Sequence, residues 1–208
     1  MVRRKKGKEH RFAEQNVQFT TTGGPTVNVW YSIGPKGKGR LFLAENHQLY
    51  DSFGNKLGRG TAHKGFDSES YCNLLEHHAL PSIKRQMGEE TWYFVQDNAS
   101  IHTAKLADKS ERKIDRILRM FRVQDVKWPA KSCDLNCIEN VHPLIQREMD
   151  AYLSGHPDRW PKNKKELFRI VLRSYQKVDN ELVKKIYFKF LERCLEVYRL
   201  KGRNNFDA

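Results

Sequence analysis

The sequence lacks the features that mark secreted, disulfide-stabilised or membrane-spanning proteins. Its 4 cysteines among 208 residues form no close-spaced framework. No run of apolar residues is long enough to cross a membrane, and no amino-terminal stretch has the pattern of a signal peptide. These absences predict free thiols and an intracellular protein.

Acidic residues are scarce relative to basic ones. The chain has 38 Lys and Arg against 25 Asp and Glu, a formal net charge of +13, and only 38% hydrophobic residues. Its length still suffices for one domain with a buried core. The basic excess favours a polyanionic partner, and nucleic acid fits better than a membrane surface because neither terminus carries a basic helix with a strong apolar face. A solvated basic surface without a partner is the plain alternative.

The order of predicted elements is that of an α/β protein with a mixed sheet flanked by helices. Residues 26–45 alternate like a β-hairpin around a Gly- and Pro-rich loop, and 47–64 hold two turn signals, which predict a second hairpin or a long loop. Asp67 is placed to cap a helix. The remaining segments are predicted as strands at 92–96 and 123–128 with a basic helix between them at 103–122, followed by helices after residue 136, at 164–177 and at 181–201.

Two carboxylates are placed alike in this order of elements. Asp97 closes the strand at 92–96, and Glu139, with 41 residues between the two acids, opens the helix that follows the strand at 123–128. If the two strands are neighbours, both acids reach the same end of the sheet. Asp and Glu oxygens suit Mg²⁺ or Mn²⁺, and metal pairs held by such acids cleave phosphodiesters. The alternative is that Asp97 simply caps the next helix.

The residues around both acids resemble those of one family. Residues 95–104, read as VQDNASIHTA, are similar to the QDNAxxHTA segment of mariner-superfamily DDE transposases. Residues 128–140, read as WPAKSCDLNCIEN, are similar to their WPAxSPDLNPIEN segment. Weaker matches follow the same order at 2–4, 27–30 and 70–83. The resemblance covers residues 1 to about 150.

The resemblance implies a ribonuclease H-like fold and metal-dependent cleavage and strand transfer of DNA ends. Asp97 matches the second catalytic acid and Glu139 the third, so both are expected to be catalytic and to bind Mg²⁺ or Mn²⁺. Asn98 and His102 match motif positions beside the site or facing DNA, and Asp134 matches an aspartate that caps a turn. The expected partner is DNA, and no membrane contact is expected. The chain is also expected to form a homodimer and to be located in the nucleus.

Several basic side chains are candidate contacts to DNA phosphates. They lie in the amino-terminal basic run, in the hairpin loop and after the Asp97 motif, namely Arg3, Arg4, Lys5, Lys36, Lys38 and Lys105. A solvated surface is the alternative for each of them.

One departure from the family concerns activity. The family's first catalytic Asp lies on an opening strand ahead of the basic segment that here begins at Val2. Asp51 and Asp67 fall in a loop and a helix cap, so neither is a natural substitute. The chain is therefore predicted to be an incomplete core over 1–153, with the opening strand missing and an exposed sheet edge, and a helical extension over 154–208 packed on it.

Other departures lie around Glu139. Cys133 and Cys137 stand where the family has prolines, and His142 stands where a Trp is common. A zinc site from these three lacks a fourth ligand and the usual spacing, so sequence drift explains them better. The family's paired helix-turn-helix modules are absent from the chain. The sequence thus predicts a transposon-derived DDE endonuclease and strand-transfer domain with impaired catalysis, or alternatively a domesticated, non-enzymatic DNA-binding or protein-interaction scaffold.

Overall fold

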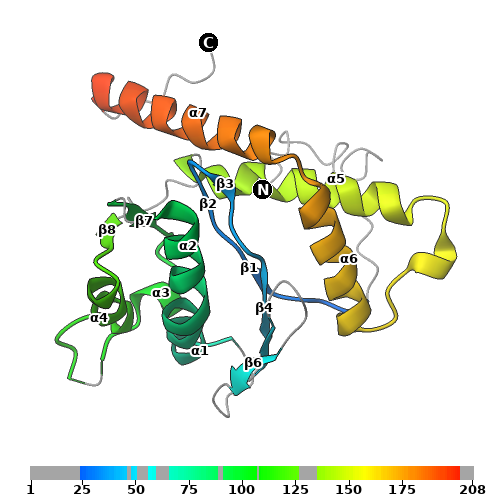
Figure 1. Cartoon of the computed structure of the whole chain (residues 1–208), viewed down its shortest axis with the longest axis horizontal. Helices are drawn as coiled ribbons and strands as arrows, with labels where there is room; N and C mark the ends of the chain where they lie inside the picture. The colour runs from blue at the N-terminus through cyan, green and yellow to red at the C-terminus, as the bar shows by residue number, and fades with distance from the viewer. Residues whose placement is uncertain are drawn as a thin grey trace, which may run out of the picture.

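Three small β-sheets packed among helices make up the described part of the chain (Figure 1). The computed structural model describes residues 24–45, 48–50, 56–59, 66–88, 91–106, 108–126 and 135–201. This mixture of helices and small sheets is that of the predicted α/β class.

The first sheet is antiparallel and has the order β1-β4-β5-β6. Its strands are β1 (Val29–Trp30), β4 (Phe42–Glu45), β5 (Gln48–Tyr50) and β6 (Lys56–Arg59). The β1–β4 pair confirms the hairpin predicted at 26–45, and the β5–β6 pair confirms the second hairpin.

A smaller hairpin interrupts the connection from β1 to β4. It consists of β2 (Ile33–Gly34) and β3 (Gly37–Lys38). Gly37 has φ +95° and its backbone lies against Asn180, so that a Cβ atom here would come within 2.1 Å of the Asn180 side-chain oxygen. Both the backbone conformation and the close approach therefore require glycine.

The third sheet pairs β7 (Tyr93–Val95) with β8 (Gln124–Val126) in parallel. The two predicted strands are therefore neighbours, as the site hypothesis requires. Parallel and antiparallel pairs both occur, but in the described residues they belong to separate sheets rather than to the one mixed sheet predicted.

Helices surround these sheets (Figure 1). Asp67 caps the first of them, as predicted, by accepting a hydrogen bond from the Ser70 N–H at 2.8 Å. None of the helices in the described ranges has the length and apolar character to cross a membrane. The longer helices are α1 (Ser68–Leu74), which continues through a π-helical turn (Leu75–Ala79) into α2 (Leu80–Met87), then α4 (Lys113–Met120), α5 (His142–Leu153), α6 (Lys164–Lys177) and α7 (Asn180–Arg199).

The predicted basic helix at 103–122 is wrong as a single element. The chain forms α3 (Ser100–Thr103) and then turns before α4 begins at Lys113. Asp108 accepts hydrogen bonds from the N–H and hydroxyl of Ser110, which stabilises a turn instead of a helix. A new helix then starts where Arg112 and Asp115 form a capping box.

Strand β4 and its approach divide the hydrophobic core in two. Phe42 packs with α1, α2, β7 and α4 in a first cluster, whereas Leu41 and Leu43 pack with α5, α6 and α7 in a second. Residues 41–43 are at most 6% exposed. Since successive side chains of a strand point to opposite faces, one short strand serves both clusters.

The second cluster joins the two predicted domains. Tyr31 and Leu43 lie in it together with Phe168, Tyr175 and Val183 from the last two helices. The helices after residue 153 complete a core that begins in the first hairpin. The division at 153/154 stays a prediction.

Lys38 fastens the small hairpin to the end of α6. Its ammonium group donates to the carbonyl oxygens of Tyr175, Gln176 and Val178, with the first two at 2.6 and 3.0 Å. Its backbone N–H also donates to the Asn180 side chain at 2.9 Å. A cation thus satisfies carbonyl groups that the helix end leaves without intrahelical partners.

Replacing Lys38 should weaken the fold more than replacing its neighbour Lys36. Lys38→Met leaves three carbonyl groups without their charged donor, so we expect the free energy of unfolding to fall by about 2 kcal/mol. Lys36 is exposed, and Lys36→Met should change it by less than ~0.5 kcal/mol. Urea unfolding at neutral pH measures both, and equal losses in the two variants would contradict this role.

Candidate functional site

Asp97 lies just beyond β7, at the edge where two parallel strands end. The register pairs Val95 with Val126 at the last positions of β7 and β8. In parallel sheets the carboxyl ends of the strands meet at one edge, where sites are usually built. The Asp97 side chain is 55% exposed there, so it is accessible to a ligand.

The Asp97 carboxylate is held by the loop and helix that follow it. Its Oδ1 accepts a hydrogen bond from the Ala99 N–H at 3.0 Å and lies 2.8 Å from Nδ1 of His102. Helix α3 begins after Ala99 without a side-chain cap. Asp97 therefore forms a turn within the loop and does not cap the next helix, which removes the plain alternative for this residue.

Tyr71, on α1, packs against this loop and stabilises it. Its ring lies 4.5 Å from the His102 ring, centroid to centroid, and its hydroxyl donates to Gln96 Oε1 at 2.6 Å. Tyr71 is 1% exposed, and burial raises the pKa of its hydroxyl. The sequence identified Tyr71 only as an apolar position on a helix, because no local pattern shows which loop a buried tyrosine supports.

A second acid near this edge, Asp125, has a structural role that the sequence did not reveal. It stands opposite Phe94 in the β7–β8 ladder and its side chain is 12% exposed. Arg112 forms ion pairs with both Asp125 and Asp115. The guanidinium group thus ties the start of α4 to β8 through Asp125 Oδ2, whereas Asp125 Oδ1 is buried without a hydrogen-bond partner among the described residues.

Glu139 lies in a segment that is anchored in the second hydrophobic cluster. It lies on a 3-10 turn, η5 (Cys137–Asn140), and its side chain is exposed. Two residues later, Val141 is fully buried in the second cluster and leads into α5. Pro143 lies in the first turn of α5, as predicted, where its missing N–H has no cost.

His142 joins the start of α5 to the first hairpin. The buried hydroxyl of Tyr31 donates to Nδ1 of His142 at 2.8 Å, and the two rings meet edge to face. Burial raises the pKa of Tyr31, so its hydroxyl keeps its proton. The contact fixes the beginning of the helix that follows Glu139.

The described residues do not complete a metal site. Asp97 and Glu139 have no hydrogen bond or ion pair with one another there, and no group of three His, Cys, Asp or Glu side chains is placed to hold a metal in the described ranges. Their oxygen chemistry suits Mg²⁺ or Mn²⁺, but two carboxylates fill only part of an octahedral shell, and waters or substrate phosphates would have to supply the rest. The metal-binding roles of Asp97 and Glu139 stay predictions.

The cysteines near Glu139 pack instead of gathering a metal in the described part. Burial raises the pKa of the Cys137 thiol to about 11, and Cys194 on α7 lies close enough to add to this shift. Cys133 and Asp134 lie outside the described residues.

The predicted phosphate contacts differ in their surroundings. Lys38 is occupied by the end of α6, which argues against a phosphate contact. Lys36 and Lys105 are exposed, as is Asn98. Arg3, Arg4 and Lys5 lie outside the described residues, so their role stays a prediction.

Comparisons with known proteins identify DNA transposases as relatives. The Tc3 transposase of Caenorhabditis elegans is 24% identical over 180 residues, which is 86% of this chain and 45% of that protein. The Tcb1 transposase of Caenorhabditis briggsae is 24% identical over 136 residues, or 65% of this chain and 44% of that protein. The chain spans less than half the length of these relatives. No family model matches it.

Solved structures of the Mos1 transposase catalytic domain also match. One, with raltegravir and Mn, has a TM-score of 0.46 at 16% identity, covering 86% of this chain and 82% of that one. The Mos1 mariner transposase catalytic domain crystal structure gives the same TM-score at 15% identity, covering 86% and 81%.

The chain is thus a relative of DNA transposases. More particularly, its relatives confirm the resemblance to transposases of the mariner/Tc1 type that the two motifs predicted.

His142 should make the stability of the fold depend on pH. Burial lowers the pKa of His142 below its ordinary value near 6.5, and Glu139 partly opposes the shift. The unfolded chain therefore binds the proton more readily, so stability is full above pH ~6.5 and falls as the pH drops below that value. Protonation also removes the acceptor for Tyr31. In urea unfolding across this range, His142→Asn, whose side-chain oxygen can replace Nδ1, should lose less stability than wild type; parallel curves would contradict this.

Proposed function

We propose that this chain is a transposon-derived DDE-type domain with a ribonuclease H-like fold, which binds DNA and whose cleavage and strand-transfer activity is impaired. The similarity to transposases supports the assignment to this class of protein. The site supports the DDE-type chemistry, because Asp97 follows one strand of a parallel pair and Glu139 follows the other along the chain. It also supports impaired activity, because no third metal-binding side chain is grouped with them in the described residues.

The parallel pairing of β7 and β8 is the observation that supports this function best. The pairing brings the ends of the two strands, Val95 just before the Asp97 loop and Val126, to one edge of the sheet. The contact between Asp97 Oδ1 and His102 Nδ1, at 2.8 Å, and the packing of Tyr71 against His102 keep the carboxylate at that edge. A metal ion held by these two acids would stabilise charge on a phosphodiester, but two carboxylates alone form a weak site.

DNA is the proposed partner because of charge as well as relationship. The net charge of +13 favours contact with phosphates, and such contacts weaken steeply as salt rises. Endonuclease and DNA-integration activities, the nuclear location and the homodimer predicted from the sequence stay predictions.

A nicking assay tests whether catalysis is impaired. Supercoiled DNA carrying mariner-type element ends is incubated with the purified chain and Mg²⁺ or Mn²⁺. Because the acids are too few, we expect no more nicking than from the Asp97→Ala/Glu139→Ala variant, while both proteins bind the DNA equally. Metal-dependent nicking that either single substitution abolishes would refute the impaired activity and support an active enzyme.

A protein-interaction scaffold is the second candidate, and one feature of α7 favours it. Phe188, Leu191, Leu195 and Tyr198 are exposed by 39–84% and recur three or four residues apart, so they share one side of the helix. Such exposed apolar stripes mark contacts with other proteins. Absence of DNA binding at low salt would favour this second candidate over the first.

A further inference from the structure

Helix α6 presents a row of cations on its exposed side. Lys165, Arg169 and Arg173 are four residues apart and all exposed, while Phe168 and Val171 on the other side are buried. At 1.5 Å per residue the row is about 12 Å long. Like charges at this spacing destabilise a helix, so the row has no value for the helix itself.

The row lies in a segment with little acidic compensation. Residues 156–177 contain 7 Lys or Arg against 2 Asp or Glu. One of these acids, Glu166, accepts hydrogen bonds from the Lys162 N–H and the Asn163 side chain, both at 2.8 Å, and so caps α6. No ion pair joins Lys165 or Arg169 to an acid among the described residues.

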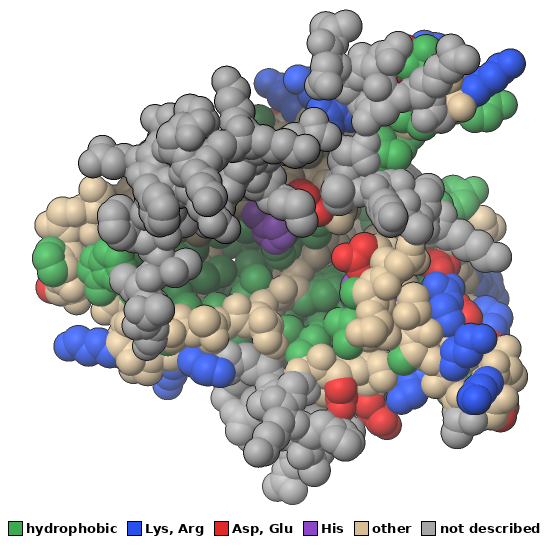
Figure 2. All heavy atoms as spheres, turned by 180° about the vertical axis from the view of Figure 1, so that it is seen from behind, with side chains coloured by type: hydrophobic (Ala, Val, Ile, Leu, Met, Phe, Trp, Pro, Cys, Tyr) green, Lys and Arg blue, Asp and Glu red, His purple; other side chains and the backbone are tan. Residues whose placement is uncertain are grey.

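Cations elsewhere on the molecule are better balanced. On α4 and the turn before it, Arg119 pairs with Glu111 at 2.7 Å, and Lys113 lies 3.8 Å from Glu69. Figure 2 shows acidic side chains among the Lys and Arg at the end of the molecule formed by α1–α4. The excess on α6 is therefore not shared by the surface of α1–α4.

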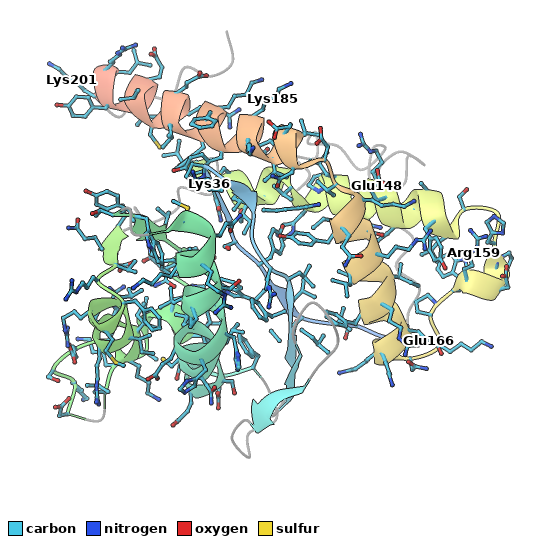
Figure 3. The ribbon with its side chains drawn as sticks, in the orientation of Figure 1. Lys36, Glu148, Arg159, Glu166, Lys185 and Lys201 are labelled. Carbon is cyan, nitrogen blue, oxygen red and sulfur yellow. The ribbon has the colours of Figure 1, made fainter. Side chains whose placement is uncertain are left out.

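Two arginines at the end of this row are held in place by an aromatic ring. The guanidinium carbons of Arg159 and Arg173 lie 5.0 and 4.6 Å from the ring centre of Tyr152. Arg159 also donates to the Tyr152 carbonyl oxygen at 3.2 Å. Figure 3 shows Arg159 beside the end of α5 and Glu166 in the first turn of α6. Pre-positioned guanidinium groups lose less freedom when they bind phosphate.

An exposed tryptophan adjoins these arginines. Trp160 follows Arg159 directly and is 52% exposed. It is followed by Pro161, which restricts the backbone on that side. Cations that follow a phosphate backbone, together with an aromatic side chain on which a base can stack, are the two parts of single-strand binding surfaces.

We propose that this surface binds a single strand of nucleic acid, with phosphates along the cationic row and an unpaired base on Trp160. We call it the α6 surface, formed by Arg159, Trp160, Lys165, Arg169 and Arg173. The inference rests on the proposed function only in taking nucleic acid as the partner.

Paired charge substitutions test the cationic row. Lys165→Gln/Arg169→Gln removes two charges from α6, and Lys185→Gln/Lys189→Gln removes two exposed charges at the same spacing from α7 (Figure 3). Fluorescence anisotropy with a labelled mixed-sequence oligodeoxynucleotide measures affinity across a salt series. We expect the α6 pair to lose about tenfold or more and its salt slope to fall by about 1.4, and the α7 pair to change about twofold at most.

Substitutions of the tryptophan test strand selectivity. Trp160→Ala should weaken binding of the single strand by about tenfold, Trp160→Phe should restore most of it, and a duplex of the same length should be affected by neither. Thermal unfolding confirms that each variant is folded.

The possible failures are distinguishable. Wild-type protein that binds neither strand nor duplex overturns the DNA partner of the proposed function and the α6 surface with it. Wild-type binding that the α6 and α7 pairs weaken equally, or that Trp160→Ala leaves unchanged, overturns the α6 surface alone. Equal loss of single-strand and duplex binding in Trp160→Ala overturns the stacking of an unpaired base.

Discussion

The alternation of side chains along residues 41–43 is the constraint on which the rest of the structure depends. Phe42 fills one core while Leu41 and Leu43 fill the other, and all three are almost completely buried. A shift of one residue in the β1–β4 register would send each side chain into the wrong core. The pairing of Trp30 with Phe42 therefore fixes how the two halves of the molecule meet.

Residues 41–43, which contribute to both cores, also determine how the two candidate acids are placed relative to one another. Asp97 follows β7, whose Phe94 belongs to the first core, and Glu139 precedes Val141, which belongs to the second. Lys38 and the Tyr31–His142 contact hold the second core to the same hairpin. Any chemistry that uses both acids thus depends on packing far from either carboxylate. Mutations in residues 41–43 should therefore affect the positions of both acids together.

The sequence predicted the elements whose signals are local and missed those that depend on distant partners. Asp67 as a cap and α6 at 164–177 follow from capping residues and helical periodicity, and the structure has both. The break at Asp108 was missed because the helical pattern continues through it, whereas a side-chain turn competes with the helix. The contact of Tyr71 with the Asp97 loop and the hydrogen bonds of Lys38 to the end of α6 form between residues far apart in sequence, which no local pattern reveals.

Titration with Mn²⁺ followed by electron paramagnetic resonance tests most directly whether the two acids form a competent metal site. Unbound Mn²⁺ gives a sharp signal that disappears on binding. The account predicts no site in the intact chain that fills below about millimolar Mn²⁺, since no group of three metal-binding side chains is placed around Asp97 or Glu139 among the described residues. Binding of about two ions per chain at micromolar Mn²⁺, lost in both Asp97→Ala and Glu139→Ala, would contradict it and indicate an intact catalytic centre.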